Sequence, residues 1–240
     1  MMKKVKRFCL AVLLLSGATA AEAQESKVET TIEADIVSQY VWRGQDLGDV
    51  SLQPTLGLGY KGLSLTAWGS VGLTDPDDTK EFDLTLAYSA GGFNIGVTDY
   101  WFNSGLDPRN RYFKYDAHGT NHLFEANFGY DFGPVALQWY TNFAGNDGVT
   151  KSGKRAYSSY FELSAPFKLA SVDWTAALGV VPYATSFYER VDGFAVTNVS
   201  LTATKDVKIT DSFSIPLFAQ VAANPCSQKA YLVLGLKLRP

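Results

Sequence analysis

The fold of this chain is decided by residues 28–44, VETTIEADIVSQYVWRG, whose alternate residues form two contrasting sets. One set is largely apolar and ends in two aromatic residues: Val28, Thr30, Ile32, Ala34, Ile36, Ser38, Tyr40 and Trp42. The other set carries three carboxylates, a glutamine and an arginine: Glu29, Thr31, Glu33, Asp35, Val37, Gln39, Val41 and Arg43. Successive side chains of a β-strand point to opposite faces, so a two-residue period indicates a strand. The stretch therefore predicts one long strand with an apolar and a polar face.

The same alternation recurs along the rest of the chain. Comparable runs lie near residues 52–61, 63–71, 81–88, 93–101, 124–130, 135–143, 157–164, 172–180, 198–204, 213–221 and 232–239. No helical pattern separates them, which favours antiparallel neighbours joined by turns. The sequence predicts an all-β protein of about twelve antiparallel strands.

A strand with one apolar face can belong to a soluble sandwich or to a membrane barrel that turns this face to lipid. The connections alternate between about 6–17 residues and about 2–5, a rhythm typical of long outer loops and short periplasmic turns. Aromatic residues gather at both strand ends, where membrane interfaces favour them. One group lies beside the short connections: Tyr60, Tyr88, Phe93, Tyr130, Phe167 and Phe213. The other lies beside the long ones: Tyr40, Trp42, Trp101, Trp139, Phe143 and Tyr157. Together these features favour a transmembrane antiparallel β-barrel over a sandwich.

The first 23 residues have the pattern of a cleaved secretory signal peptide. A basic segment leads into the short apolar run Leu10–Leu15, and Ala21–Ala23 matches an A-x-A cleavage site. We expect residues 24–240 to form the barrel. No later apolar run reaches 18 residues, which excludes membrane-spanning helices, and a net charge of −3 leaves no basic excess for nucleic acid.

The segment Ser38–Gly44 resembles the opening motif of the TorF-like family of Gram-negative outer-membrane porins. Two further elements of that family follow here, the pair Gln53-Pro54 and the segment Trp68-Gly69-Ser70. The resemblance implies an outer-membrane location in a Gram-negative bacterium and a transport role, with no substrate. We expect outer-membrane lipids, small solutes and the barrel-assembly machinery as partners. Outer-membrane barrels usually end in an aromatic residue, whereas this chain ends Leu238-Arg239-Pro240.

The charged residues on the polar faces are the candidate functional residues, and they would line the lumen. These are Glu33, Asp35, Arg43, Glu81, Asp83, Glu125, Glu162, Asp173, Lys237 and Arg239. With Lys61 also counted, seven acids face four bases, which favours cations in a water-filled pore. Alternatively, the same charges pair across strands and fill a plugged structural barrel. The basic loop from Arg109 to Lys114 could fold inward over the mouth.

An outer-membrane lipid-modifying enzyme is the remaining alternative, because some such barrels use a serine and a histidine. Only His118 and His122 are present, and no serine lies two residues from His118 on the same strand face. In strand geometry the two histidines stand about 13 Å apart, which does not suit a metal ion. We expect no catalytic residues, metal site or cofactor.

Overall fold

The computed structural model describes residues 28–75, 77–104, 111–116, 119–189, 191–211 and 213–239. Within these ranges the chain forms fourteen strands and no helix. The strands are β1 (Glu29–Val37), β2 (Tyr40–Trp42), β3 (Gln45–Gly48), β4 (Ser51–Tyr60), β5 (Leu63–Gly72), β6 (Thr79–Ala90), β7 (Phe93–Ser104), β8 (His122–Asp131), β9 (Ala136–Gly145), β10 (Ser159–Leu169), β11 (Val172–Val181), β12 (Ala195–Lys208), β13 (Ser214–Asn224) and β14 (Lys229–Leu238).

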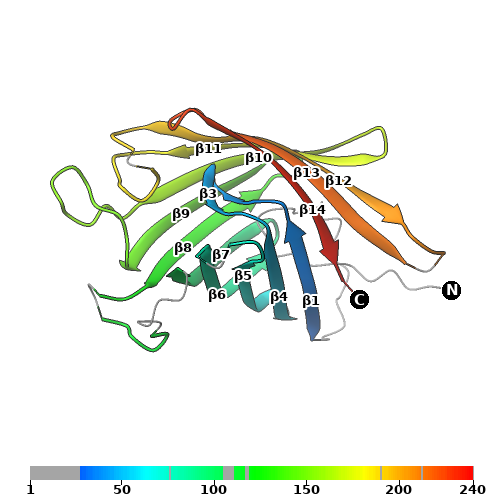
Figure 1. Ribbon diagram of the computed structural model, residues 1–240, viewed down its shortest axis with the longest axis horizontal. Helices are drawn as coiled ribbons and strands as arrows, with labels where there is room; N and C mark the ends of the chain where they lie inside the picture. The colour runs from blue at the N-terminus through cyan, green and yellow to red at the C-terminus, as the bar shows by residue number, and fades with distance from the viewer. Residues whose placement is uncertain are drawn as a thin grey trace.

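Twelve of the described strands close into one antiparallel barrel, and β2 and β3 form a separate two-stranded sheet. Neighbours in sequence pair around the wall from β4 to β14, and β14 pairs with β1 along Ala34–Val37 to close it (Figure 1). This confirms the all-β class, the antiparallel pairing and the count of about twelve wall strands. Among the described residues no helix is long and apolar enough to cross a membrane.

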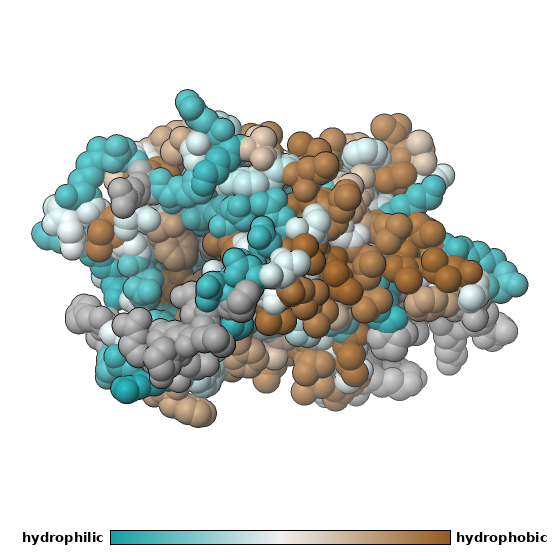
Figure 2. All heavy atoms as spheres, viewed as in Figure 1, coloured by the Kyte–Doolittle hydropathy of each residue, from teal (hydrophilic) through white to brown (hydrophobic). Residues whose placement is uncertain are grey.

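The outward face of the barrel is apolar, and the inward face is polar. Figure 2 shows apolar side chains gathered over the face where β1, β13 and β14 lie in Figure 1. Many outward aliphatic residues are strongly exposed, among them Ile32, Leu56, Leu58, Leu65, Leu86, Ile95, Leu232 and Leu234. Their strand neighbours Glu33, Thr55, Thr66 and Val233 are buried in the interior. The alternation along each strand therefore sorts side chains as the sequence predicts.

The aromatic belt beside the short turns is present as predicted. Its six members are 42–45% exposed at the outward face: Tyr60, Tyr88, Phe93, Tyr130, Phe167 and Phe213. At the opposite end, Phe143 and Tyr157 are exposed, but Tyr40 and Trp42 are only 7% and 9% exposed. The assignment of Tyr40 and Trp42 to the outer belt is wrong, because both lie inside the barrel.

The predicted strand 28–44 stops early, and this break explains the two misplaced aromatic residues. β1 ends at Val37, the chain bends at Ser38 and Gln39, and β2 and β3 then form a hairpin of their own. The turn at Arg43 and Gly44 has positive φ values of 51° and 78°. We call residues 40–48 the inner hairpin, since its side chains contact the far wall of the barrel.

The signal peptide and the domain boundary after residue 23 fall outside the described residues, so both stay predictions. Part of the loop between β7 and β8 is described, and it does not fold over the mouth. Tyr112 packs against Phe82 and Trp101, and both of these residues point outward from the wall. The possibility that this loop folds inward over the mouth is therefore wrong for residues 111–116, while Arg109 lies outside the described residues.

The orientation of the wall can be tested with adjacent residues of β6. Leu86 points outward and is 54% exposed, whereas Thr85 points inward and its hydroxyl oxygen lies 2.9 Å from that of Thr98. In lipid bilayers we expect Leu86→Arg to lower the free energy of unfolding by about 2–4 kcal/mol, since arginine is costly near the bilayer midplane. Thr85→Arg is the matched variant and should cost less. Equal losses in denaturant titrations of the refolded protein would contradict this orientation.

Candidate functional site in the barrel interior

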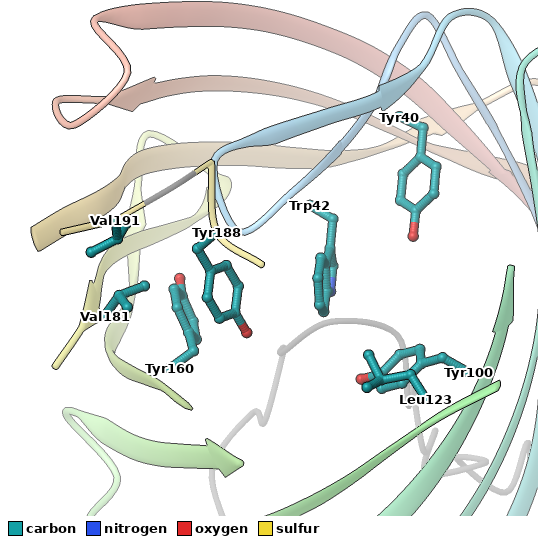
Figure 3. Close-up of a cluster of buried hydrophobic side chains, with 8 residues drawn as sticks. All are labelled: Tyr40, Trp42, Tyr100, Leu123, Tyr160, Val181, Tyr188 and Val191. Atoms are coloured by element: carbon teal, nitrogen blue, oxygen red, sulfur yellow. The ribbon is translucent and has the colours of Figure 1, made fainter. Parts of the chain in front are cut away.

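The inner hairpin meets the barrel wall through a cluster of buried aromatic side chains. Figure 3 shows Trp42, Tyr188 and Tyr160 side by side. The rings of Trp42 and Tyr188 stack at 6.2 Å between centroids, and those of Tyr188 and Tyr160 at 5.7 Å. Tyr188 belongs to the loop 182–194, which follows β11, so this loop also reaches into the interior. The hairpin and this loop fill the barrel interior toward its long-loop end.

Arg43 is the charged centre of this cluster. Its Nη1 donates to Glu125 Oε2 at 2.6 Å, and its Nη2 donates to Glu125 Oε1 at 2.9 Å. Nη1 also donates to the Tyr188 hydroxyl at 2.7 Å. The side chains of Arg43 and Glu125 are 6% and 3% exposed, so this bidentate pair is almost fully removed from water. Such pairs combine charge with fixed geometry, which positions the turn of the hairpin.

Aromatic faces surround the same guanidinium. Its carbon lies 3.9 Å from the ring centroid of Tyr140, 4.3 Å from that of Trp42 and 4.8 Å from that of Tyr160. All three distances fall within the range of cation–π attraction. Burial raises the pKa of the loop residue Tyr188, so its hydroxyl stays protonated while it accepts from Arg43. The site thus holds the planar guanidinium of Arg43 by an ion pair, by hydrogen bonds and by contact with aromatic ring faces.

The tip of the hairpin is held against β12 and β13. Asn224 Nδ2 donates to the carbonyl oxygen of Gly44 at 3.0 Å. A Cβ on Gly44 would overlap the backbone oxygen of Thr197, so only glycine lets the tip approach β12 this closely. Tyr40 donates from its hydroxyl to Glu81 Oε2 at 2.8 Å, which ties the start of the hairpin to β6.

The sequence-predicted acids fall into several groups. Glu33 and Asp35 share Lys237, whose Nζ lies 3.3 Å and 3.2 Å from their carboxylate oxygens. Glu125 pairs with Arg43. In the described part of the chain, no ion pair links Glu81, Asp83 or Glu162 to a basic side chain, although all three are buried. The interior therefore brings together six of the seven predicted acids and two of the predicted bases.

The remaining predicted residues lie away from this interior cluster. Asp173 pairs with Lys168 at 3.1 Å beside the turn between β10 and β11, and both side chains are strongly exposed. Arg239 pairs with Asp206 at 3.0 Å near the chain end. Lys61 is exposed in the turn between β4 and β5. Asp173, Arg239 and Lys61 lie at the strand ends beside the short turns, so an inward position in the alternation does not place them among the interior charges.

Sequence reasoning did not identify the tyrosines that complete the site. Tyr100 donates to Glu125 Oε1 at 2.8 Å, and Tyr160 donates to Glu162 Oε2 at 2.8 Å. Tyr160 also occupies the space above Gly179, where a Cβ would collide with its ring. The available signal was the two-residue period, because Tyr160 lies on the same inward face as Glu162, and Tyr140 on the same inward face as Gln138. Tyr188 lies in a loop and carries no such signal.

His122 is far from this interior site, on the outward face of β8. Its Nδ1 lies 2.7 Å from Asp99 Oδ1, and its Nε2 contacts the carbonyl oxygen of Tyr112. Tyr115 stacks on its ring at 4.2 Å, and the side chain is fully buried. Among the described residues, no serine side chain bonds to His122, and no group of three or more His, Cys, Asp and Glu residues could hold a metal ion. His118 lies outside the described residues.

Comparison with known proteins gives weak similarities. No family model matches the chain. No curated protein matches it. Among the solved structures that resemble it is an outer membrane channel from Pseudomonas putida F1, at 14% identity and TM-score 0.43, covering 91% of this chain and 98% of that one. Another comes from a study of the in-meso crystallization of membrane proteins, at 8% identity and TM-score 0.42, covering 88% and 83%. At these values neither resemblance carries an argument about function.

The buried ion pair can be tested with a double-mutant cycle. We expect Arg43→Met to destabilise the protein by about 3–5 kcal/mol, because it leaves Glu125 buried without a partner. Glu125→Gln should cost a similar amount. The double variant should lose clearly less than the sum of the two single losses, as measured by denaturant unfolding in detergent or lipid. Additive losses would show that the two side chains are not coupled.

Proposed function

We propose that this protein is an outer-membrane channel for small solutes, with a preference for cations. The observation that carries the proposal is the sorting of its wall. A closed barrel turns exposed aliphatic residues outward and encloses five buried acids, the half-buried Asp35 and two bases. A wall of this kind suits lipid outside and a polar path inside.

The interior is filled at one end only. Toward the long loops, the inner hairpin and Tyr188 pack tightly against the wall. Toward the short turns, inward residues such as Thr85, Thr202 and Gln220 stay partly exposed. We infer that the polar path is closed by the hairpin and that conduction requires the hairpin to move.

A plugged structural barrel is the second candidate, and the same hairpin favours it. The Arg43–Glu125 pair and the stacked aromatic rings give the plug a packed, specific seat. In that case the hairpin stays in place and no solute passes. The two candidates differ in whether the hairpin leaves its seat, which conductance can measure.

We further propose that the protein resides in the outer membrane of a Gram-negative bacterium, inserted by the barrel-assembly machinery. The outward apolar surface and the belt at the short turns support contact with outer-membrane lipids. The resemblance of Ser38–Gly44 to TorF-like porins points the same way. We propose no enzymatic activity, since His122 is buried beneath Tyr115 and bonded to Asp99. No cofactor enters the proposal.

Conductance in planar bilayers tests the channel directly. In one variant, residues 40–48 are replaced by a Gly/Ser linker of the same length, which removes the Arg43 anchor. We expect stepwise currents that are larger and more frequent than those of the wild-type protein. The matched control replaces the exposed loop residues 151–154 with a linker of equal length and should behave as wild type. Silence of both the wild type and the hairpin variant would favour the structural barrel.

Selectivity is tested by the reversal potential across a salt gradient. Glu81→Gln combined with Asp83→Asn removes two interior charges, so we expect the cation preference of the open pore to fall. The preference should also shrink with added salt, since the Debye length falls from about 30 Å at 0.01 M to about 3 Å at 1 M. Asp173→Asn is the control, because this residue lies at the exposed turn. An unchanged reversal potential in the double variant would show that other groups set selectivity.

A further inference from the structure

The contacts around Arg43 describe a binding site as well as a structural ion pair. A bidentate carboxylate, a hydroxyl oxygen and two flanking tyrosine rings are the groups that would recognise a guanidinium on a small molecule. We infer that Glu125, Tyr140, Tyr160 and Tyr188 form a cage for guanidinium-bearing solutes, which Arg43 occupies when the hairpin is seated. We call these four residues the guanidinium cage.

The cage is built by parts of the chain other than the hairpin. Glu125 comes from β8, Tyr140 from β9, Tyr160 from β10 and Tyr188 from the loop 182–194. Three of these residues stand on neighbouring wall strands that pair along their length. If Arg43 leaves, the strand ladder still holds their backbones at the same spacing.

Contacts independent of Arg43 also orient two of the four cage side chains, Glu125 and Tyr160. The Tyr100 hydroxyl donates to Glu125 Oε1 at 2.8 Å. Tyr160 is fixed by its bond to Glu162 and by Asn198, whose Nδ2 donates to the Tyr160 hydroxyl at 3.3 Å. A site whose groups are already oriented loses less conformational entropy when a ligand enters. The cage is therefore prepared for a free guanidinium.

The inner hairpin, which carries Arg43 into the cage, makes few backbone contacts with the barrel wall. The inner hairpin pairs only with itself, between Tyr40–Trp42 and Gln45–Gly48, and joins no strand ladder of the wall. An isolated two-stranded hairpin is marginally stable in water, so its side-chain contacts hold it in the barrel. Arg43 supplies the charged contact among them, and a solute that carries the same group competes for the same partners.

The surrounding charge selects the ligand class. Glu81, Asp83 and Glu162 lie in the same interior, and no basic side chain of the described residues forms an ion pair with them, so the field at the cage attracts cations and repels anions. An ammonium group is a point donor and cannot match the bidentate geometry at Glu125. The expected solute is thus a small molecule with a terminal guanidinium, and as a substrate assignment this rests on the proposed channel function.

Chemical rescue tests the cage without any need for transport. Arg43→Ala removes the occupant and leaves the cage, and ethylguanidinium chloride at millimolar concentration replaces the missing group. We expect saturable stabilisation in denaturant unfolding, with the folding equilibrium constant rising about elevenfold at ten times the dissociation constant. Ethylurea, which has a similar shape and no charge, should have no such effect. Equal responses to the two compounds would overturn the inference.

A second pair of variants covers the case in which Arg43→Ala does not fold. Arg43→Lys keeps the buried charge but loses the bidentate fit, so ethylguanidinium should stabilise it more than it stabilises the wild type. The double variant Arg43→Lys with Glu125→Gln should lose this response. A response that survives Glu125→Gln, or its absence in Arg43→Lys, would also refute the cage.

Liposome flux separates this inference from the proposed function. Rescue without uptake of a guanidinium solute would support the cage and contradict the channel. Conductance without rescue would support the channel and contradict the cage. Uptake of ethylguanidinium that ethylurea does not match, and that Glu125→Gln abolishes, would support both.

Discussion

Closure of the sheet is the constraint on which the rest of this structure depends. A strand edge in lipid has no water to satisfy its backbone groups, so a membrane sheet must meet itself. Here β1 meets β14 from Ala34 to Val37, and Ser38 extends the seam by donating from its backbone nitrogen to the carbonyl oxygen of Leu234 at 2.8 Å. Once the wall is closed, every second residue is committed to an enclosed space. The composition of that space then decides what the barrel can do.

The enclosed space combines a strong charge imbalance with a packed obstruction. Glu33 and Asp35 share the one positive charge of Lys237, and Glu125 pairs with Arg43, while Glu81 and Glu162 accept hydrogen bonds from tyrosine hydroxyls. Buried carboxylates without a counter-charge are costly in a purely structural core. Their presence behind a plug is easier to understand if the space is hydrated when the plug is absent. The interior carboxylates and the hairpin that covers them thus belong to one design, in which the hairpin closes a polar space.

Most of the fold followed from a local rule, and the site did not. Alternation within each strand determined which residues face outward, so Leu86 and Glu81 were placed correctly from their neighbours alone. The same rule failed after Val37, because nothing in the alternation of residues 38–44 shows that the chain leaves the wall. The aromatic residues Tyr40 and Trp42 fit an interface belt and an interior core equally well by composition. Their destination is set by partners such as Tyr188, which lies about 150 residues away in sequence and in a loop.

The long reach of the inner hairpin has a consequence for the order of folding. Glu125 and Asn224 lie 82 and 180 residues after their respective partners Arg43 and Gly44 in the sequence. Contacts of such high sequence separation form slowly, because a long segment must be ordered before they stabilise anything. The hairpin therefore reaches its seat only after β8 and β13 have joined the wall. The segment that fills the barrel is among the last parts of the chain to be seated.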